Sequence, residues 1–541
     1  MTAAIHPDIA GAEFWAHFHP HLASFSIAPA LATHMMLEEI CRAIDITSVT
    51  VRENPRSASW WAARENFGPL CREYFAGDSI RVKTIPGSLL HLMRQATLPT
   101  AAAYIGRREM REDLNELTRT APQPSPTESD ILFVGGGAAV ADIINRIWQP
   151  LTEEHGLACN IVDVHHDHFT QAIARYDLPT IDFGAFVSDD IIDTARRRQQ
   201  QWRSWWNYYR QRRSDVQSYG DLPSGVRTSV DTRMRVAFAR RVQHWLIKSL
   251  AARDAIETLQ PSVVVAFHQH LFPNSGLVSW AKERGIPCVT IQHGVVGDFR
   301  HFLPTLSPDI MLVWGQYAQE LFGAIYGDSV QIHQTGHSLY DNLANREPAV
   351  RPEVAALRGN HHHMIVLATQ PNEAQFFKHY SDWWIEHVAG AAGALDAALL
   401  LKLHPADQNH DLYRKVHRKH PDTVQIIEHG TVPLDDLLVA ADLMITRNST
   451  VVLEANILQT PVVTIDLTQN VEHFPFSESG GAVHVTSAEE ILPALKDALA
   501  EDRSPALDAE KRDEFLRAHA GPIDGQATRR IVEHLERLVR R

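Results

Sequence analysis

The residues of this chain that could do chemistry stand directly after apolar, strand-like runs in its second half. LLLKLHP places His404 and Pro405 at such a point, and MITRNSTVVLEA places Ser449 and Thr450 there, with Glu454 about one helical turn further on. Ser449, Thr450 and the free amides of a helix start can hold phosphate oxygens, because the N–H groups and the positive end of the helix dipole point the same way. These positions predict a nucleotide site.

Each remaining polar group has a role in that site. Glu454 can accept from both ribose hydroxyls, and His404 can donate to a phosphate oxygen and so stabilise a departing nucleotide. Gln370, at the end of MIVLATQ, and Asn448 are expected beside them. The structural alternative is that Ser449 and Thr450 only cap a helix and that Glu454 lies on a solvated helix face.

In the first half the same rule selects histidines. AFHQH puts His268 and His270 after one strand-like run, and TIQHG puts Gln292, His293 and Gly294 after the next. A histidine suits a general base because its unperturbed pKa of about 6.5 lies near neutral pH. The alternatives are core histidines or a metal pair, although HQH lacks a carboxylate or cysteine at helical spacing, so we expect no metal.

A glycine run also follows a strand-like run. Gly135, Gly136 and Gly137 come after ILFV, but Val140 stands where the phosphate-binding GxGxxG pattern needs its last glycine. We expect these glycines, together with Gln292 and Gly294, to line the acceptor side of a cleft. A purely structural tight turn explains the glycines equally well.

The positions of these residues require two parallel sheets. Strand-like runs at 131–134, 160–164, 262–267, 288–292 and 309–315, and again at 364–370, 398–405, 423–428, 443–449 and 461–467, alternate with helical patterns. This alternation is typical of α/β doubly wound domains, whose ligands bind outside the carboxyl ends of the strands. We therefore predict two Rossmann-like domains facing a cleft.

The remaining segments complete the domain organisation. The predicted units are an accessory domain at 1–118, a first Rossmann-like domain at 131–345 with a helical insertion at 187–258, a second at 364–500, and C-terminal helices at 501–541 that pack across the junction. Within the insertion, residues 196–213 are rich in Arg, Trp and Tyr, which indicates either peripheral contact with an anionic membrane or Trp packed into the core.

Composition excludes several classes of protein. The 541 residues carry a formal charge of −14, which argues against general binding of nucleic acid. Four scattered cysteines without a CxxC pair indicate neither a disulfide framework nor a sulfur-rich metal site. Without a signal-like start or a long apolar run, a cytoplasmic protein is expected, with the inner face of the membrane as the alternative.

Roughly residues 260 to 485 resemble bacterial surface-carbohydrate transferases of the GT-B fold, on the strength of GIPCVTIQHGVVGDF, LLLKLHP and PLDDLLVAADLMITRNSTVVLEANILQTPVV. The similarity is to the capsule-synthesis and CDP-glycerol glycerophosphotransferase group, with non-hydrolysing UDP-N-acetylglucosamine 2-epimerases as more distant relatives. In that group and in bacterial sialyltransferases, an HP pair and a Ser/Thr pair bind the phosphate of a cytidine nucleotide. The resemblance therefore implies a CMP- or CDP-linked donor, with His293 as the base.

The chain departs from these families at two motifs. The acid-acid-glycine motif that supplies the base in sialyltransferases is absent, since Gln292 and His293 occupy that place, and of the double glutamate of the epimerases only Glu454 remains. Three hypotheses follow. The first is a metal-independent glycosyltransferase that needs no cofactor beyond its nucleotide-sugar donor. Its expected donor is a CMP-linked 2-keto-3-deoxy sugar, and its acceptor is a glycan, a lipid-linked molecule or a protein. A CDP-glycerol-type polyol-phosphate transferase is a variant of this hypothesis. The others are a UDP-N-acetylglucosamine 2-epimerase-like enzyme and a non-catalytic membrane-associated scaffold.

Overall fold

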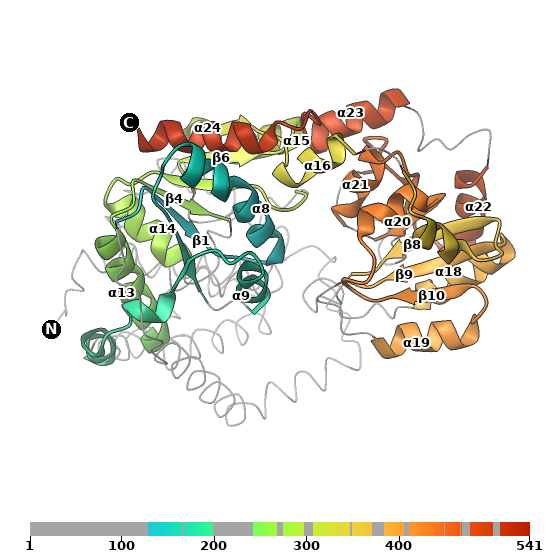
Figure 1. The fold of residues 1–541 in the computed structure, drawn as a ribbon, viewed down its shortest axis with the longest axis horizontal. Coiled ribbons are helices and arrows are strands. Elements are labelled where there is room, and N and C mark those ends of the chain that lie inside the picture. Colours follow the sequence, from blue (N-terminus) through green and yellow to red (C-terminus); the bar gives the residue numbers. More distant parts are fainter. Residues whose placement is uncertain are drawn as a thin grey trace, which may run out of the picture.

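The chain forms two α/β units joined by a short linker and by its C-terminal helices (Figure 1). The computed structural model describes residues 128–164, 167–197, 242–267, 274–296, 307–346, 349–370, 383–404, 410–447, 449–465, 467, 476–500 and 509–540. The predicted accessory domain at 1–118 and residues 198–241 of the predicted insertion lie outside these ranges.

The N-terminal unit is built on a seven-stranded parallel sheet in the order β3-β2-β1-β4-β5-β6-β7. Its strands are β1 (Ile131–Val134), β2 (Cys159–Asp163), β3 (Thr180–Asp182), β4 (Val263–Ala266), β5 (Cys288–Ile291), β6 (Ile310–Val313) and β7 (Gln331–Gln334). The main helices are α8 (Ala138–Gln149), α9 (Asp167–Ala174), α13 (Val242–Leu259), α14 (Asn274–Glu283) and α15 (Gln316–Tyr326). β1, β4, β5 and β6 are buried at every position, because helices cover both faces of a parallel sheet.

The C-terminal unit carries a six-stranded parallel sheet in the order β10-β9-β8-β11-β12-β13. Its strands are β8 (His363–Ala368), β9 (Ala397–Lys402), β10 (Val424–Ile427), β11 (Leu443–Thr446), β12 (Val462–Ile465) and β13 (Val483–Val485). Its helices are α18 (Trp383–Ala394), α19 (His410–Lys419), α20 (Leu434–Ala440), α21 (Val451–Ile457) and α22 (Ala488–Ala498).

Both sheets have the topology of a doubly wound fold. The first strand in chain order lies inside each sheet, so that β1 pairs with β2 and β4, and β8 pairs with β9 and β11. The connections run to opposite sides of that strand, which creates a crevice at the carboxyl ends of the strands where such folds bind ligands. The predicted class of two Rossmann-like domains is confirmed, as is the parallel pairing of β4 with β5.

Two turns connect the N-terminal unit to the linker. The 3₁₀ turn η9 (Ser338–Tyr340) and the short helix α16 (Asp341–Ala344) follow β7, and α17 (Pro352–Ala355) precedes β8. Each sheet has its own apolar core, and a third cluster crosses the boundary. This boundary cluster combines Trp314 and Tyr340 of the N-terminal unit with Met444, Val452 and Leu453 of the C-terminal unit.

Two C-terminal helices run along one edge of both units (Figure 1). α23 (Ala509–His519) packs against α15 and α21, and α24 (Ala527–Val539) returns over α8. Between them the chain lies so close to β6 that a Cβ on Gly521 would collide with the carbonyl oxygen of Trp314. Gly521 also has a φ of +80°, a conformation that glycine adopts without strain.

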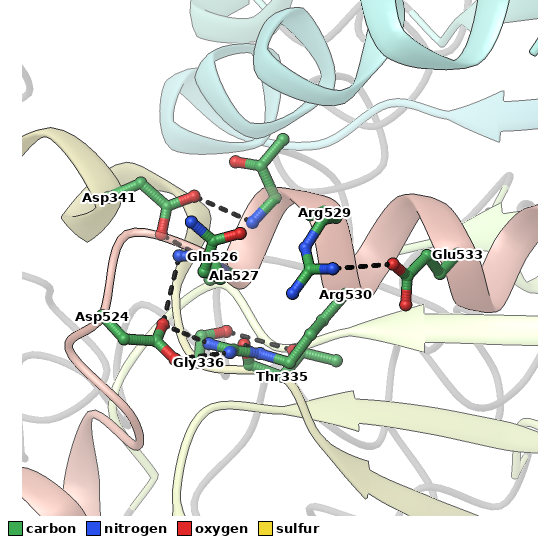
Figure 2. A network of polar contacts seen from close by, with 10 residues as sticks. Thr335, Gly336, Asp341, Asp524, Gln526, Ala527, Arg529, Arg530 and Glu533 are labelled. Carbon is green, nitrogen blue, oxygen red and sulfur yellow. Dashed lines mark hydrogen bonds and ion pairs between the residues drawn. The ribbon is translucent and has the colours of Figure 1, made fainter. Parts of the chain in front are cut away.

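Polar contacts fix the start of α24 to the N-terminal unit (Figure 2). The carboxylate of Asp341 accepts from the amides of Ala527 and Thr528 at 2.9 and 2.8 Å. Arg530 donates to the carbonyl of Thr335 at 2.8 Å and pairs with Asp524. The segment that follows β7 is thereby held in place by the C-terminal end of the chain.

Candidate functional site

A cavity of about 660 Å³ lies between the two units. Its walls come from α8 and the turn after α9 in the N-terminal unit, from η9 and α16, which follow β7, and from α20 and α21 of the C-terminal unit. The lining residues are Asp142, Asn145, Arg146, Tyr176, Leu339, Asn342, Asp435 and Glu454. Three carboxyl groups therefore share the cavity with one guanidinium, and the amides and the phenol add neutral donors and acceptors.

Hydrogen bonds within the N-terminal unit orient its side of the cavity. Arg146 Nη1 donates to Asn342 Oδ1 at 3.1 Å, and the hydroxyl of Tyr176 donates to the carboxylate of Asp142. Burial, followed by that hydrogen bond, raises the pKa of Tyr176 to about 12, so the phenol stays protonated at neutral pH. Arg146 thus keeps a fixed direction on α8.

Ion pairs connect the linker to the C-terminal unit beside the cavity. Arg346, just after α16, bridges Asp435 and Asp436 at the start of α20. Arg351 adds a contact to Asp436 at 3.1 Å. Because Asp435 also lines the cavity, these contacts set the position of α20 relative to the N-terminal unit.

Glu454 is the predicted nucleotide-binding residue that the structure places in this cavity. It lies on α21, one turn from the start of the helix, and is partly buried. Burial raises the pKa of its carboxyl from 4.5 to about 7, so at neutral pH the group is divided between its acid and its carboxylate forms. A carboxyl held at this balance is typical of a functional site.

The other predicted nucleotide residues gather at the carboxyl ends of three neighbouring strands. His404 follows β9 and is exposed, Gln370 follows β8, and Ser449 follows β11. The amide of His404 donates to the hydroxyl of Thr369 at 3.0 Å, which ties the ends of β9 and β8 together. The strand order therefore brings these three positions to one edge of the sheet.

Ser449 and Thr450 adopt the conformation of a helix start. The hydroxyl of Ser449 accepts from the amide of Val451 at 3.3 Å, and Thr450 makes no capping hydrogen bond with its side chain. Local capping thus occupies the Ser449 hydroxyl, as the structural alternative expects. Their binding of phosphate stays a prediction. Pro405 and Asn448, predicted for the same site, lie outside the described residues.

On the N-terminal side an aromatic stack follows β6 and β7. Trp314 is fully buried, and the ring of His337 stacks on it with centroids 4.2 Å apart. Tyr340 packs against the same histidine at 4.4 Å. Burial, with smaller contributions from Arg146 and His293, lowers the pKa of His337 to about 3, so its ring is neutral at neutral pH.

His293 lies close to this stack. It is partly buried after β5, its ring meets Phe267 edge-on at 6.4 Å, and its charge would reach His337. Since a useful general base titrates near the working pH, His337 is a poor base, and the role of His293 as base stays a prediction. His268 and His270, the other predicted bases, lie outside the described residues.

Gln292 and the glycine run have structural roles in the chain. The Gln292 side chain accepts from the amide of Trp314 at 2.8 Å and donates to the carbonyl of Gly294 at 2.9 Å, which ties β5 to β6. Gly135 is packed so closely against Phe169 that a Cβ would overlap its ring. Gly136 is buried and Gly137 precedes α8. A role on the acceptor side stays a prediction for these residues.

Several residues of the site escaped the sequence analysis. His337 could have been found, because it follows β7 just as His293 follows β5. Arg146 and Tyr176 gave no comparable signal, since they lie well inside or just beyond helices, where polar residues usually face solvent. Only the packing of the two units brings them opposite Glu454.

The described part of the chain contains neither a group of metal ligands nor a membrane-spanning helix. Within it, no three His, Cys, Asp or Glu side chains are grouped so that they could hold a metal ion. Within the same ranges, no helix combines the length and the apolar character that crossing a membrane requires. Of the segment predicted to touch a membrane, 196–213, only the first two residues are described.

Two Rossmann-like units with a cavity between them are the arrangement of the GT-B fold. The model of the UDP-N-acetylglucosamine 2-epimerase family matches residues 294–536, which is less than half of the chain. The matched region begins after β5 and contains the whole C-terminal unit with Glu454. No curated protein matches the sequence significantly.

Solved structures with a similar arrangement share little sequence with the chain. The putative UDP-N-acetylglucosamine 2-epimerase of Listeria monocytogenes is 15% identical over 75% of this chain and 95% of its own, with a TM-score of 0.47. The UDP-GlcNAc 2-epimerase of Methanocaldococcus jannaschii, in complex with UDP-GlcNAc and UDP, is 15% identical over 76% and 99%, with a TM-score of 0.46. The wall teichoic acid polymerase TagF, soaked with CDPG, is 12% identical over 85% and 98%, with a TM-score of 0.44.

Proposed function

We propose that this chain is an enzyme that acts on a nucleotide sugar bound between its two Rossmann-like units. The observation that carries the proposal is the cavity of about 660 Å³ in which Glu454 of α21 faces Arg146 of α8. Residues of both units line it, as a substrate held across a two-domain cleft requires. The edge formed by β9, β8 and β11 offers His404, Gln370 and Ser449 to the nucleotide.

The proposed division of labour follows from the chemistry of each group. Glu454 as a carboxylate accepts from the ribose hydroxyls, while His404 and the start of α21 meet the phosphates. Arg146 supplies positive charge from the opposite wall. His293, next to the neutral ring of His337, takes the role of general base.

The charge of the cavity favours a neutral sugar. Arg346 compensates Asp435, which leaves Asp142 and Glu454 against Arg146, so a sugar acid placed there would bring a further carboxylate beside two carboxyl groups. A hexosamine meets the same groups with hydroxyl and amide hydrogen bonds. Together with the epimerase family model over residues 294–536, this supports UDP-N-acetylglucosamine as the first substrate to test and 2-epimerisation as the reaction.

The test is direct. Purified protein is incubated with UDP-N-acetylglucosamine, and proton NMR follows the mannosamine epimer and free UDP. We expect product from the wild type, a loss of at least tenfold in the Glu454→Gln variant, and an unchanged rate in Glu533→Gln, whose partly exposed carboxylate pairs with Arg529 on α24. A wild type that forms neither product nor a UDP complex would refute the assignment.

A transferase is the second candidate, favoured by one residue. Of the double glutamate that the resemblance to epimerases implies only Glu454 remains, and the residue before it, Leu453, is apolar and fully buried. A chain with one glutamate suits transfer from a CMP-, CDP- or UDP-linked donor to a glycan, lipid-linked or protein acceptor. Nucleotide released only when acceptor is added, without any epimer, would select this candidate. Contact of residues 196–213 with an anionic membrane is part of the same proposal.

A further inference from the structure

Tyr340 carries a buried hydroxyl that the N-terminal unit does not use. The residue is 4% exposed, and its hydroxyl has no hydrogen-bond partner among the described residues. His337 at 4.4 Å and Trp314 at 6.0 Å pack against its ring and fix its direction. Burying an unpaired hydroxyl is unfavourable. A hydrogen-bond partner that this hydroxyl gains when a ligand binds would explain why a tyrosine stands at this position.

The charged group that acts on this hydroxyl belongs to the other unit. Tyr340 shares the boundary cluster with Val452 and Leu453 of α21, and the next residue of that helix is Glu454. The pKa of Tyr340 is raised first by burial and then by the charge of Glu454, so the phenol stays protonated close to this carboxyl. A donor of one unit thus lies within electrostatic reach of an acceptor of the other.

We propose that Tyr340 is a positioning residue for Glu454: in the nucleotide-bound enzyme its phenol donates a hydrogen bond to one carboxylate oxygen, which leaves the other oxygen to accept from the ligand. The inference rests on the proposed function, because it assumes that Glu454 contacts a bound nucleotide. A hydrogen bond from a neutral donor stabilises a carboxylate against its protonated form. Tyr340 therefore favours the form of Glu454 that can accept.

The surroundings of Glu454 make such a donor useful. The charged and titratable groups that share its cavity are Asp142 and Arg146 from α8, Tyr176 from the turn after α9 and Asp435 from α20. On the other side of α21, α23 contributes Phe515, Leu516 and His519, and burial lowers the pKa of that histidine to about 4. Arg146 is the cation of this set, and it already donates to Asn342.

The experiment measures the affinity for UDP by calorimetry between about pH 5.5 and pH 8.5. Tyr340→Phe removes one oxygen and keeps the ring. Tyr326→Phe is the matched control, because Tyr326 is also buried with a hydroxyl that lacks a partner among the described residues, but it packs in a different cluster, with Met311 and Val313. Glu454→Gln and the double variant complete a double-mutant cycle.

We expect Tyr340→Phe to weaken UDP binding about tenfold above the Glu454 pKa of about 7 and less than twofold at pH 5.5, where that carboxyl is protonated. In the Glu454→Gln background the same substitution should cost less than twofold, and Tyr326→Phe should cost nothing measurable. A purely structural role would instead weaken binding equally at every pH.

The two hypotheses fail in distinguishable ways. If Glu454→Gln weakens UDP binding but Tyr340→Phe has the same effect at every pH or in both backgrounds, the inference about Tyr340 is wrong and the proposed function stands. If the wild type binds none of UDP, CDP and CMP, or if Glu454→Gln leaves their binding unchanged, both are wrong.

Discussion

Replacing Glu454 with glutamine is expected to stabilise the protein above neutral pH while it weakens nucleotide binding. Burial moves the pKa of this carboxyl from 4.5 to about 7, which means that the folded state resists its ionisation. Each pKa unit corresponds to about 1.4 kcal/mol, so the shift sets an upper bound of roughly 3 kcal/mol. The carboxyl keeps contact with water in the cavity, and we therefore expect about 1–2 kcal/mol.

The sign of the effect depends on pH. Below about pH 4.5 the group is protonated in the folded and the unfolded chain, and glutamine should change little. Between 4.5 and about 7 the unfolded chain loses the proton that the folded chain retains, so folding stability falls as the pH rises. Above pH 7 the whole penalty is present. Glutamine, which carries no charge, removes it.

Differential scanning calorimetry at about pH 5 and pH 8 measures this difference. For units of 150–250 residues, 1 kcal/mol shifts the melting temperature by about 2–4 °C, so the variant should melt about 2–8 °C higher at pH 8 and close to wild type at pH 5. Glu490→Gln is the control of opposite sign, because hydrogen bonds from Thr486 and Ser487 lower the pKa of Glu490 at the start of α22.

Two outcomes would contradict this account of Glu454. An equal shift at both pH values would mean that glutamine acts through packing. A lower melting temperature at pH 8 would mean that the ionised carboxyl already has a stabilising partner in the folded chain. Either result would remove the physical reason for treating Glu454 as a functional rather than a structural residue.

Three further predictions concern the contact between α24 and the N-terminal unit. Asp341→Ala removes the acceptor of the first amides of α24 and should cost about 1–2 kcal/mol, with faster hydrogen exchange in that helix. Gly521→Ala should lower the melting temperature, because the new Cβ would collide with the carbonyl of Trp314. As the pH falls from about 6.5 to 4, α24 should lose protection from hydrogen exchange, and His534→Asn should make this loss smaller. Burial and the nearby His333 lower the pKa of His534 to about 4, so protonation of this histidine favours release of the helix.

Controls for these variants lie on the same helix or share the same backbone conformation. Glu533→Gln alters a partly exposed pair with Arg529 on α24 (Figure 2) and should leave the exchange of its first amides unchanged. Gly430 has a φ of +79°, close to the +80° of Gly521, but a Cβ on Gly430 would meet no atom within 4 Å, so Gly430→Ala separates the strain of the backbone conformation from the collision. If Gly430→Ala destabilised the chain as much as Gly521→Ala, close packing against β6 would not be the cause.

The sequence predicted the fold class because buried parallel strands require unbroken apolar runs. ILFV and CVTI are buried at every position, and the strands β1 and β5 lie where those runs stand. β3 and β13 were not predicted, because each is three residues long and mixes polar with apolar side chains. Strands this short depend on pairing with their neighbours more than on their own pattern.

The site was predictable only where it follows a strand. The rule that selected Glu454, His404 and His293 applies to residues that follow a strand, since the crevice of a doubly wound sheet lies at its strand ends, and their roles stay predictions. Arg146 and Tyr340 were not found, because nothing local distinguishes an arginine on an amphipathic helix or a tyrosine in a turn. Their roles arise from contacts between residues more than a hundred positions apart, which no local pattern encodes.

Hydrogen exchange with and without UDP tests the central claim, that a nucleotide binds between the two units, most directly. We expect slower exchange in α21, at the ends of β8 and β9 and in the turn at 337–342, and clearly less slowing at these segments in Glu454→Gln at the same subsaturating UDP concentration. Protection confined to other parts of the chain, or protection of the same segments that Glu454→Gln leaves intact, would contradict it.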